Sequence, residues 1–248
     1  MAPVSSPATL LDVLREVFAS NGVDPRAWAL GLARATPAVT LVPAFGLGAV
    51  PVQTRLVLGL ALGACIAPAL GATASQGPLV LAMAAEALRG VPVALLASLA
   101  VYAAMTAGGL VDDLRGAKES ITLPALPEQL PPVATLFALV AAISFLETGG
   151  AARVAGALAQ PLTFEHQTFS SVARAFASSF DLAFAIAAPL VVASVVLETA
   201  SALIARAATP AFVGPVLAPL KSLALLGVLA LVFERIAELL VVVSRAYP

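Results

Sequence analysis

The chain has 248 residues, of which 60% are hydrophobic and only 11% are charged, whereas an average soluble domain is about a quarter charged. Together with a mean hydropathy of +1.02, this composition excludes an ordinary soluble globular fold and favours helices in lipid or in a very apolar assembly. The 13 Lys and Arg residues are balanced by 14 Asp and Glu residues, so the chain lacks the basic surplus that attracts nucleic acid, which is excluded as a partner.

The first predicted element is a short amphipathic helix over residues 8–21. Its apolar side chains recur with helical spacing, and its charged side chains occupy the other side. The apolar set is Leu10, Leu11, Leu14, Val17 and Phe18, and the charged set is Asp12, Arg15 and Glu16. Two interpretations are equally supported: a helix that lies on the bilayer surface or docks on a partner, and an ordinary surface helix.

Six apolar segments follow, and they predict five to seven membrane-spanning helices, because one span needs about 20 mostly apolar residues. The segments are 35–54, 56–76, 78–111, 132–158, 180–206 and 212–244. The third and the last are too long for one simple span, and each contains helix-breaking residues: Gly90-Val91-Pro92 in the third, Gly214-Pro215 and Pro219 in the last.

Prolines inside these apolar segments free backbone groups that lipid cannot satisfy, so the helices should pack inside protein. The predicted fold class is therefore an all-α integral membrane protein, with kinked and broken helices and helical hairpins. It forms a single membrane domain over residues 1–248.

Two polar connections interrupt the apolar segments. Residues 112–132 are predicted as a polar loop, because they are rich in charge and end in several prolines. Residues 160–174 contain the only histidine, His166, beside Glu165, which we interpret as polar loop residues rather than a catalytic pair. Lys and Arg are nearly balanced around the connections, so the sequence gives no orientation in the membrane.

Two groups of charged residues lie inside apolar segments, where each charge costs about 2.5–3.5 kcal/mol unless it faces protein, water or a partner charge. Glu86 and Arg89 are three residues apart on one predicted helical face. A second group lies near the C-terminus: Glu234, Arg235 and Glu238. A proton or ion relay is one interpretation, but ion pairs between subunits are favoured, because small residues nearby, such as Gly108, would let helices of an assembly approach closely.

The sequence offers few residue arrangements that could form a catalytic site. The single histidine and the single cysteine, Cys65, are about a hundred residues apart, so spacing suggests neither a zinc ligand set nor a Cys-His nucleophile. Cys65 is interpreted as a small buried hydrophobe. No phosphate-binding loop or serine nucleophile motif is present. The sequence therefore predicts no enzyme, no metal and no cofactor.

Several short patterns, read in order, resemble the FliR/SctT family of type III secretion export-gate subunits, and the specificity lies in their shared order and matching hydropathy. They span about residues 35–235, most of the chain. The patterns are Pro43-Ala-Phe45, Val50-Pro51 with Arg55, Glu86-Ala-Leu-Arg-Gly90, the run from Ala107 to Gly116, Ala188-Pro189, Arg206 with Pro210, and Pro219-Leu-Lys221. The Arg115-Gly116 ending looks closer to the injectisome branch than to the flagellar branch.

The resemblance implies a hetero-oligomeric helical export gate in the bacterial cytoplasmic membrane, within the secretion basal body. Its partners would be two small homologous membrane subunits in several copies, an export switch protein and the secreted substrates, which cross as unfolded chains. The family also implies that the matching segment lies near the pore and helps to close it. The pore and gating residues would be Ala107, Gly108, Gly109, Asp112, Asp113, Arg115 and Gly116, and a Gly-rich, charged break between apolar helices is compatible with such a role.

One alternative function stays open at this point, a proton-coupled secondary transporter or permease. In that case Glu86 or Glu238 would be the coupling acid. The export-gate interpretation instead places Glu86, Arg89, Glu234, Arg235 and Glu238 in polar contacts between subunits.

Overall fold

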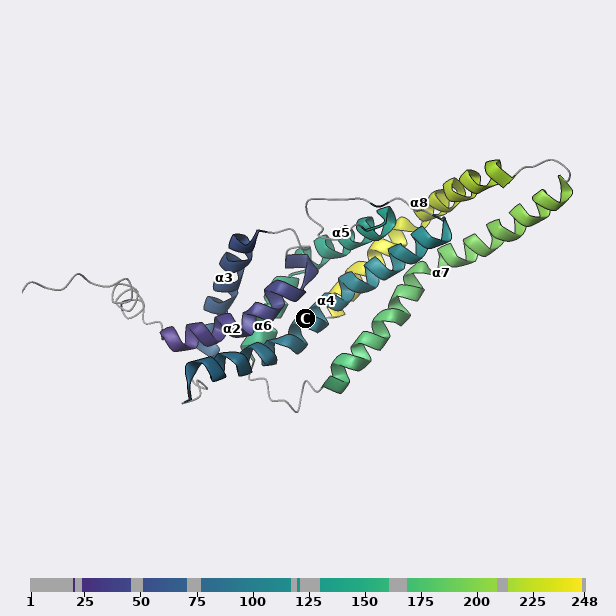
Figure 1. The fold of residues 1–248 in the computed structure, drawn as a ribbon. Coiled ribbons are helices and arrows are strands. Elements are labelled where there is room, and N and C mark those ends of the chain that lie inside the picture. The colour runs from purple at the N-terminus through teal and green to yellow at the C-terminus, as the bar shows by residue number, and fades with distance from the viewer. Residues whose placement is uncertain are drawn as a thin grey trace, which may run out of the picture.

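The computed structural model describes residues 20, 24–45, 51–70, 77–116, 120, 130–160, 169–208 and 214–246. Every regular element in these ranges is a helix (Figure 1). In chain order they are α2 (Pro25–Leu41), the short 3-10 helix η1 (Pro43–Phe45), α3 (Val52–Leu70), α4 (Leu79–Leu114), α5 (Pro132–Glu147), α6 (Gly150–Ala159), α7 (Phe169–Ala207) and α8 (Gly214–Ala246). The all-α prediction is confirmed.

The N-terminal end of α2 is fixed by local chemistry. Asp24 is the N-cap, and its side chain accepts a hydrogen bond of 2.9 Å from the backbone N–H of Arg26. Pro25 occupies the first helical position, where its missing N–H costs nothing. The helix ends at Leu41, because Val42 precedes Pro43 and is extended. The predicted span 35–54 is therefore wrong: it covers the end of α2, η1 and the start of α3.

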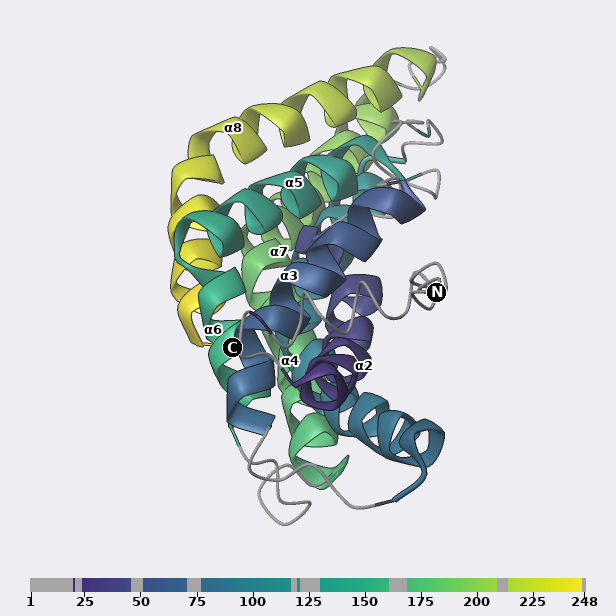
Figure 2. The ribbon, with the colours of Figure 1, turned by 90° about the vertical axis from the view of Figure 1, so that its left-hand side faces the viewer.

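Helix α2 packs against both α3 and α4 (Figure 2). The contacts depend on glycine, because a Cβ on Gly31 would lie 2.6 Å from the carbonyl oxygen of Gly63. A Cβ on Gly63 would in turn lie 2.9 Å from the backbone of Leu32. On the other side of α2, a Cβ on Gly90 would overlap the carbonyl oxygen of Arg34. Backbone therefore meets backbone at both faces of α2.

We expect Gly90→Ala to destabilise the protein by about 1–3 kcal/mol, because the added methyl group must push α4 away from α2. The control is Gly156→Ala, because Gly156 lies on α6 with no atom within 4 Å of its missing Cβ. Alanine there should be neutral or stabilise by up to about 1 kcal/mol. Thermal unfolding of the purified protein in detergent measures both, and equal melting temperatures would show that the close approach does not matter.

Helix α4 is continuous over 36 residues and passes through Gly90 and Pro92 without a break. The predicted interruption of the third segment is therefore wrong, since proline bends a helix but need not end it when neighbouring helices surround it. In α8, Gly214 and Pro215 begin the helix rather than interrupt it, and Pro219 lies inside its first turns. Asp112 and Asp113 belong to the last turn of α4, not to the polar connection.

The segment predicted as one span over 132–158 is two helices, α5 and α6, which meet at an angle of 64°. The turn lies at Thr148 and Gly149, where Gly149 has φ +77°, a left-handed conformation that glycine adopts without strain. Arg153 secures the bend, because its guanidinium donates to the carbonyl oxygen of Thr148 and to that of Ser244 on α8.

Helices α7 and α8 form a long hairpin that projects beyond the ends of α4 and α5 (Figure 1). An ion pair between Lys221 and Glu198 joins the two arms. In the projecting arms, most side chains are not buried against other parts of this chain. Where α7 crosses α4, by contrast, a buried core forms around Ala104, Ala107, Ile186 and Leu190.

Four of the described helices are long and apolar enough to cross a membrane, or five if the bent α5 and α6 pair counts as one span. The count of five is the lower limit of the predicted range of five to seven, and the count of four lies below that range. The predicted helix over residues 8–21 lies outside the described residues apart from Ser20, as do most of the 112–132 connection and His166. Residues 169–174, predicted as part of the second polar connection, belong to α7. Cys65 is exposed on α3, so its predicted burial is wrong.

Candidate functional site

The most enclosed charged cluster centres on Glu86 of α4, which is 7% exposed. Arg34 of α2, only 3% exposed, approaches the Oε2 atom of Glu86 through Nε at 2.6 Å and through Nη2 at 2.5 Å. Arg89, one turn further along α4, pairs with Oε1. Both oxygen atoms of Glu86 therefore have a cationic partner in the same chain.

The side chain of Arg34 also caps the C-terminal end of helix α6. Its Nη1 donates to the carbonyl oxygens of Leu158 at 2.9 Å and Gln160 at 3.2 Å. The last carbonyls of a helix have no intrahelical donor and carry partial negative charge, so a guanidinium there is doubly favourable. One buried arginine thus joins α2, α4 and α6. The sequence predicted Glu86 and Arg89 as contacts between subunits, but it did not identify Arg34 as their partner, because nothing in the spacing relates α2 to α4.

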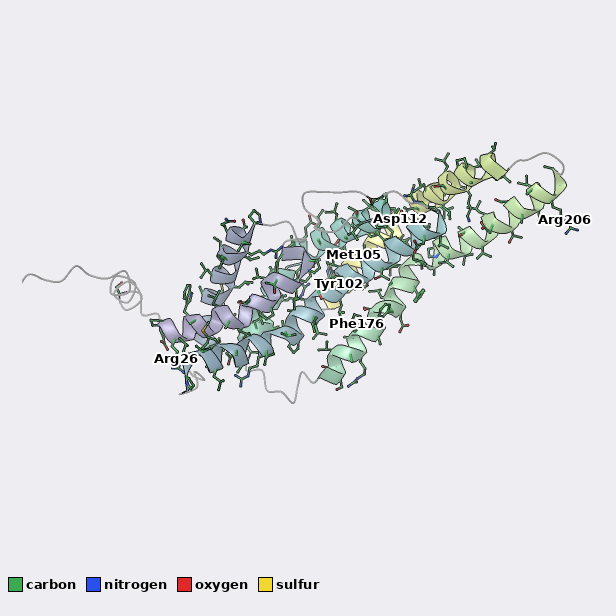
Figure 3. All side chains as sticks on the ribbon, in the orientation of Figure 1. Arg26, Tyr102, Met105, Asp112, Phe176 and Arg206 are labelled. Atoms are coloured by element: carbon green, nitrogen blue, oxygen red, sulfur yellow. The ribbon has the colours of Figure 1, made fainter. Side chains whose placement is uncertain are left out.

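A second buried carboxylate, Asp112, lies near the end of α4 (Figure 3) and is fully buried. Its Oδ2 accepts hydrogen bonds from the backbone N–H groups of Val133 at 2.8 Å and Ala134 at 3.1 Å. Its Oδ1 is 2.9 Å from both Nε and Nη2 of Arg115. The carboxylate therefore binds the first turn of α5 on one side and an arginine of its own helix on the other.

Gly108, one turn before Asp112, lies against the same part of α5. A Cβ there would be 2.5 Å from the Cα atom of Ala134 and 2.6 Å from the carbonyl oxygen of Val133. Ala107 is also buried. Gly109, in contrast, has no atom within 4 Å of the point where a Cβ would lie, and Asp113 is exposed.

The residues predicted for the pore and gate thus divide between two faces of one segment. Ala107, Gly108 and Asp112 face the core, and the guanidinium of Arg115 binds Asp112. Gly109, Asp113 and Gly116 face away from the core. Gly116 follows the helix with φ +69°, the left-handed position that commonly ends a helix, and its N–H donates to the carbonyl oxygen of Asp113 at 3.0 Å.

The third predicted group, on α8, is exposed. The side chains of Arg235 and Glu238 are 84% and 60% exposed and form a loose pair at 3.4 Å. Glu234 is exposed beside them. Arg235 and Glu238 line a shallow hollow of about 250 Å³ together with Leu239 and Val242. The ion pairs of Glu86, of Asp112 and of this group are separate from one another, and Glu86 and Asp112 lie in different parts of α4.

In the described part of the chain, no three His, Cys, Asp or Glu side chains converge in a way that would hold a metal ion. The chemistry that the three charged clusters offer is binding and positioning: a buried arginine that joins three helices, a carboxylate that binds a neighbouring helix end, and exposed opposite charges on an apolar helix.

Several helices are long and apolar enough to cross a membrane, and α4 is joined to α2 by a buried ion pair and to α5 by buried hydrogen bonds, which defines a polytopic helical membrane protein. The family model described as bacterial export proteins, family 1, matches residues 26–245. The match covers nearly the whole chain, so the protein belongs to this family and is a membrane component of a bacterial export apparatus. Among curated proteins, none is similar enough to this chain to count as a match.

Proposed function

We propose that this protein is a structural subunit of a type III secretion export gate, which forms and closes the pore for unfolded proteins in the bacterial cytoplasmic membrane. Its partners in this proposal are two small homologous membrane subunits, an export switch protein and the exported substrates. The proposal rests on membership of the export family and on one observation about the structure: the apolar helices α7 and α8 are much longer than the thickness of a bilayer, and this chain buries only a small part of each.

The lengths of α7 and α8 can be compared directly with the thickness of the hydrocarbon core. The 39 residues of α7 and the 33 of α8 correspond to about 58 Å and 50 Å at 1.5 Å per residue, whereas the hydrocarbon core is about 30 Å thick. Only 28% of the most apolar window of α7 and 11% of that of α8 are buried within the chain. Lipid cannot cover the full length of such helices, so other protein subunits must cover part of them.

The exposed charges of α8 support a protein partner rather than lipid. Leu231, Arg235, Glu238 and Val242 follow one another at helical spacing on the uncovered face of α8. An arginine and a glutamate facing lipid would each cost about 2.5–3.5 kcal/mol near the bilayer centre. A helix of a partner subunit, with an acid opposite Arg235 and a base opposite Glu238, removes that cost.

We expect Arg235→Ala to weaken retention of the small partner subunits in the purified complex. Loss of a partly buried ion pair at an interface costs about 1–3 kcal/mol, or roughly 5- to 150-fold in affinity. Arg245→Ala, at the exposed end of α8, is the control and should retain the partners. Native mass spectrometry after mild-detergent purification measures retention, and it also tests whether a single copy of this chain occurs in a large mixed complex.

The outward face of the segment 107–116 is the proposed closing surface. Gly109, Asp113 and Gly116 face away from this chain's own core, so they are available to a pore that other subunits complete. Gly116 gives this surface its conformational freedom, because it adopts a left-handed backbone conformation that other residues rarely take. Gly108 contributes close packing instead.

A proton-coupled transporter is not favoured by any observation. Such a carrier needs an acid that exchanges protons during transport, but both oxygen atoms of Glu86 are bound by arginines. Glu238 lies on an outer face rather than in an enclosed pathway.

Deleting residues 113–116, or changing Gly116 to Val, tests the gate directly. We expect an ion leak in cells that carry the assembled apparatus, and loss of substrate secretion, because the closing surface is removed or held in a strained conformation. Ion flux across the membrane and secreted protein are measured in the same cells, with assembly checked by native mass spectrometry. Unchanged leak and unchanged secretion in an assembled complex would remove the gating assignment.

A further inference from the structure

We propose that Asp112 is a positioning residue: it supplies from α4 the N-terminal cap that α5 lacks, and so makes the end of α4 and the start of α5 move as one body. The consequence for pore opening rests on the proposed gate function, whereas the cap itself does not.

The start of α5 has no cap of its own. Pro131 occupies the N-cap position without any side-chain hydrogen bond, and Pro132 is the first helical residue. The next N–H groups, of Val133 and Ala134, have no acceptor one turn back within a helix. Both donate instead to Oδ2 of Asp112. A carboxylate at this place also meets the positive end of the helix dipole.

The rest of the site holds Asp112 in this geometry. Arg115 binds its second oxygen, and the side chain of Arg115 is itself only 8% exposed. Gly108 brings the two backbones together one turn earlier. Because the carboxylate is fully buried, it cannot line a water-filled path. Of the two adjacent aspartates, Asp113 faces outward and Asp112 joins two helices.

This arrangement limits how the gate can open. Separating α4 from α5 would leave the Oδ2 atom of a buried carboxylate and two buried N–H groups without partners, which is costly. The two helix ends should therefore stay together in the open and closed states, and opening should move them jointly against the partner subunits.

The test is hydrogen exchange in the intact export complex, read by mass spectrometry on peptides that cover residues 132–136. Asp112→Ala removes the acceptor oxygens and should raise the exchange of this first turn of α5 about 5- to 30-fold, as expected for a lost helix cap. Asp113→Ala is the matched control and should leave that exchange unchanged, because its side chain is exposed.

A second change tests the mechanism. Pro131→Asp gives α5 an N-cap of its own, so the pair Asp112→Ala with Pro131→Asp should recover protection, and should recover assembly if Asp112→Ala alone does not assemble. Equal protection in Asp112→Ala and Asp113→Ala, or no recovery by Pro131→Asp, would overturn the proposal. Neither result depends on ion leak or secretion, so failure of the cap and failure of the gate function are distinguishable.

Discussion

Arg34→Met is expected to lower the free energy of unfolding by about 3–5 kcal/mol, because it removes one partner of a buried ion pair and leaves the other charged. Arg89 remains beside Glu86 but is 36% exposed and binds only the other oxygen. The change also removes the donor to the last carbonyl oxygens of α6. Since whole proteins are stable by about 5–15 kcal/mol, thermal unfolding in detergent should show a large loss.

The double variant Arg34→Met with Glu86→Leu separates the lost pair from the unpaired charge. Replacing both members of a buried pair by apolar side chains is often nearly neutral, so the double variant should recover at least half of the loss. Arg174→Met, on an exposed position of α7, is the control and should change stability by less than about 0.5 kcal/mol. Wild-type stability of Arg34→Met, or a double variant less stable than the single one, would contradict the structural role of the pair.

The same cluster distinguishes a structural role from proton coupling. In a transporter, Glu86→Gln should abolish transport while the protein still assembles. Here the carboxylate binds Arg34 and Arg89, so Glu86→Gln should reduce the amount of folded protein, and any loss of secretion should follow the loss of assembly.

The sequence predicted the spanning helices well where lipid or apolar neighbours impose a long apolar run. The cores of α3, α4, α7 and α8 fall inside the predicted segments, because the cost of placing polar groups in lipid determines residue type directly. The first span failed because apolar composition continues across Pro43, whereas the actual helix starts at the Asp24-Pro25 cap. That cap was readable from the sequence.

The bend between α5 and α6 also had a readable signal. Gly149 and Gly150 form a glycine pair inside the apolar run, and Gly149 takes a left-handed conformation that ends α5. Hydropathy over the whole segment hid this signal, because the residues on both sides are equally apolar.

Contacts between helices could not be predicted. Helical periodicity shows which residues share a face, but it does not show which face of which helix lies opposite. Arg34 meets Glu86, and Asp112 meets the N–H groups of Val133 and Ala134, only because of how the helices pack. For the same reason the segment 107–116, which the sequence treats as one gating unit, divides into a packed face and an outward face.

Gly108→Ala is expected to destabilise the protein strongly, while Gly109→Ala, one residue further, should not. A methyl group on Gly108 would lie 2.5–2.7 Å from the Cα atom and the N atom of Ala134 and from the carbonyl oxygen of Val133. These are backbone atoms that cannot rotate away, so α4 and α5 must separate. That costs about 1–3 kcal/mol for overpacking, and about 1 kcal/mol more for each weakened hydrogen bond to Asp112.

Thermal unfolding of the two alanine variants in the purified complex measures this difference.

A larger side chain at Gly109 tests the outward face without disturbing the packed face. Gly109→Leu meets no atom of its own chain within 4 Å of the new Cβ, so the folded state should keep its melting temperature. If the outward face closes the export path, the leucine should still reduce secretion, because it enters the space that substrate or partner subunits use. A destabilised Gly109→Ala would contradict the division of the segment into two faces. Full secretion by a stable Gly109→Leu variant would exclude Gly109 from the closing surface, because substrate passage would then be insensitive to bulk at that position.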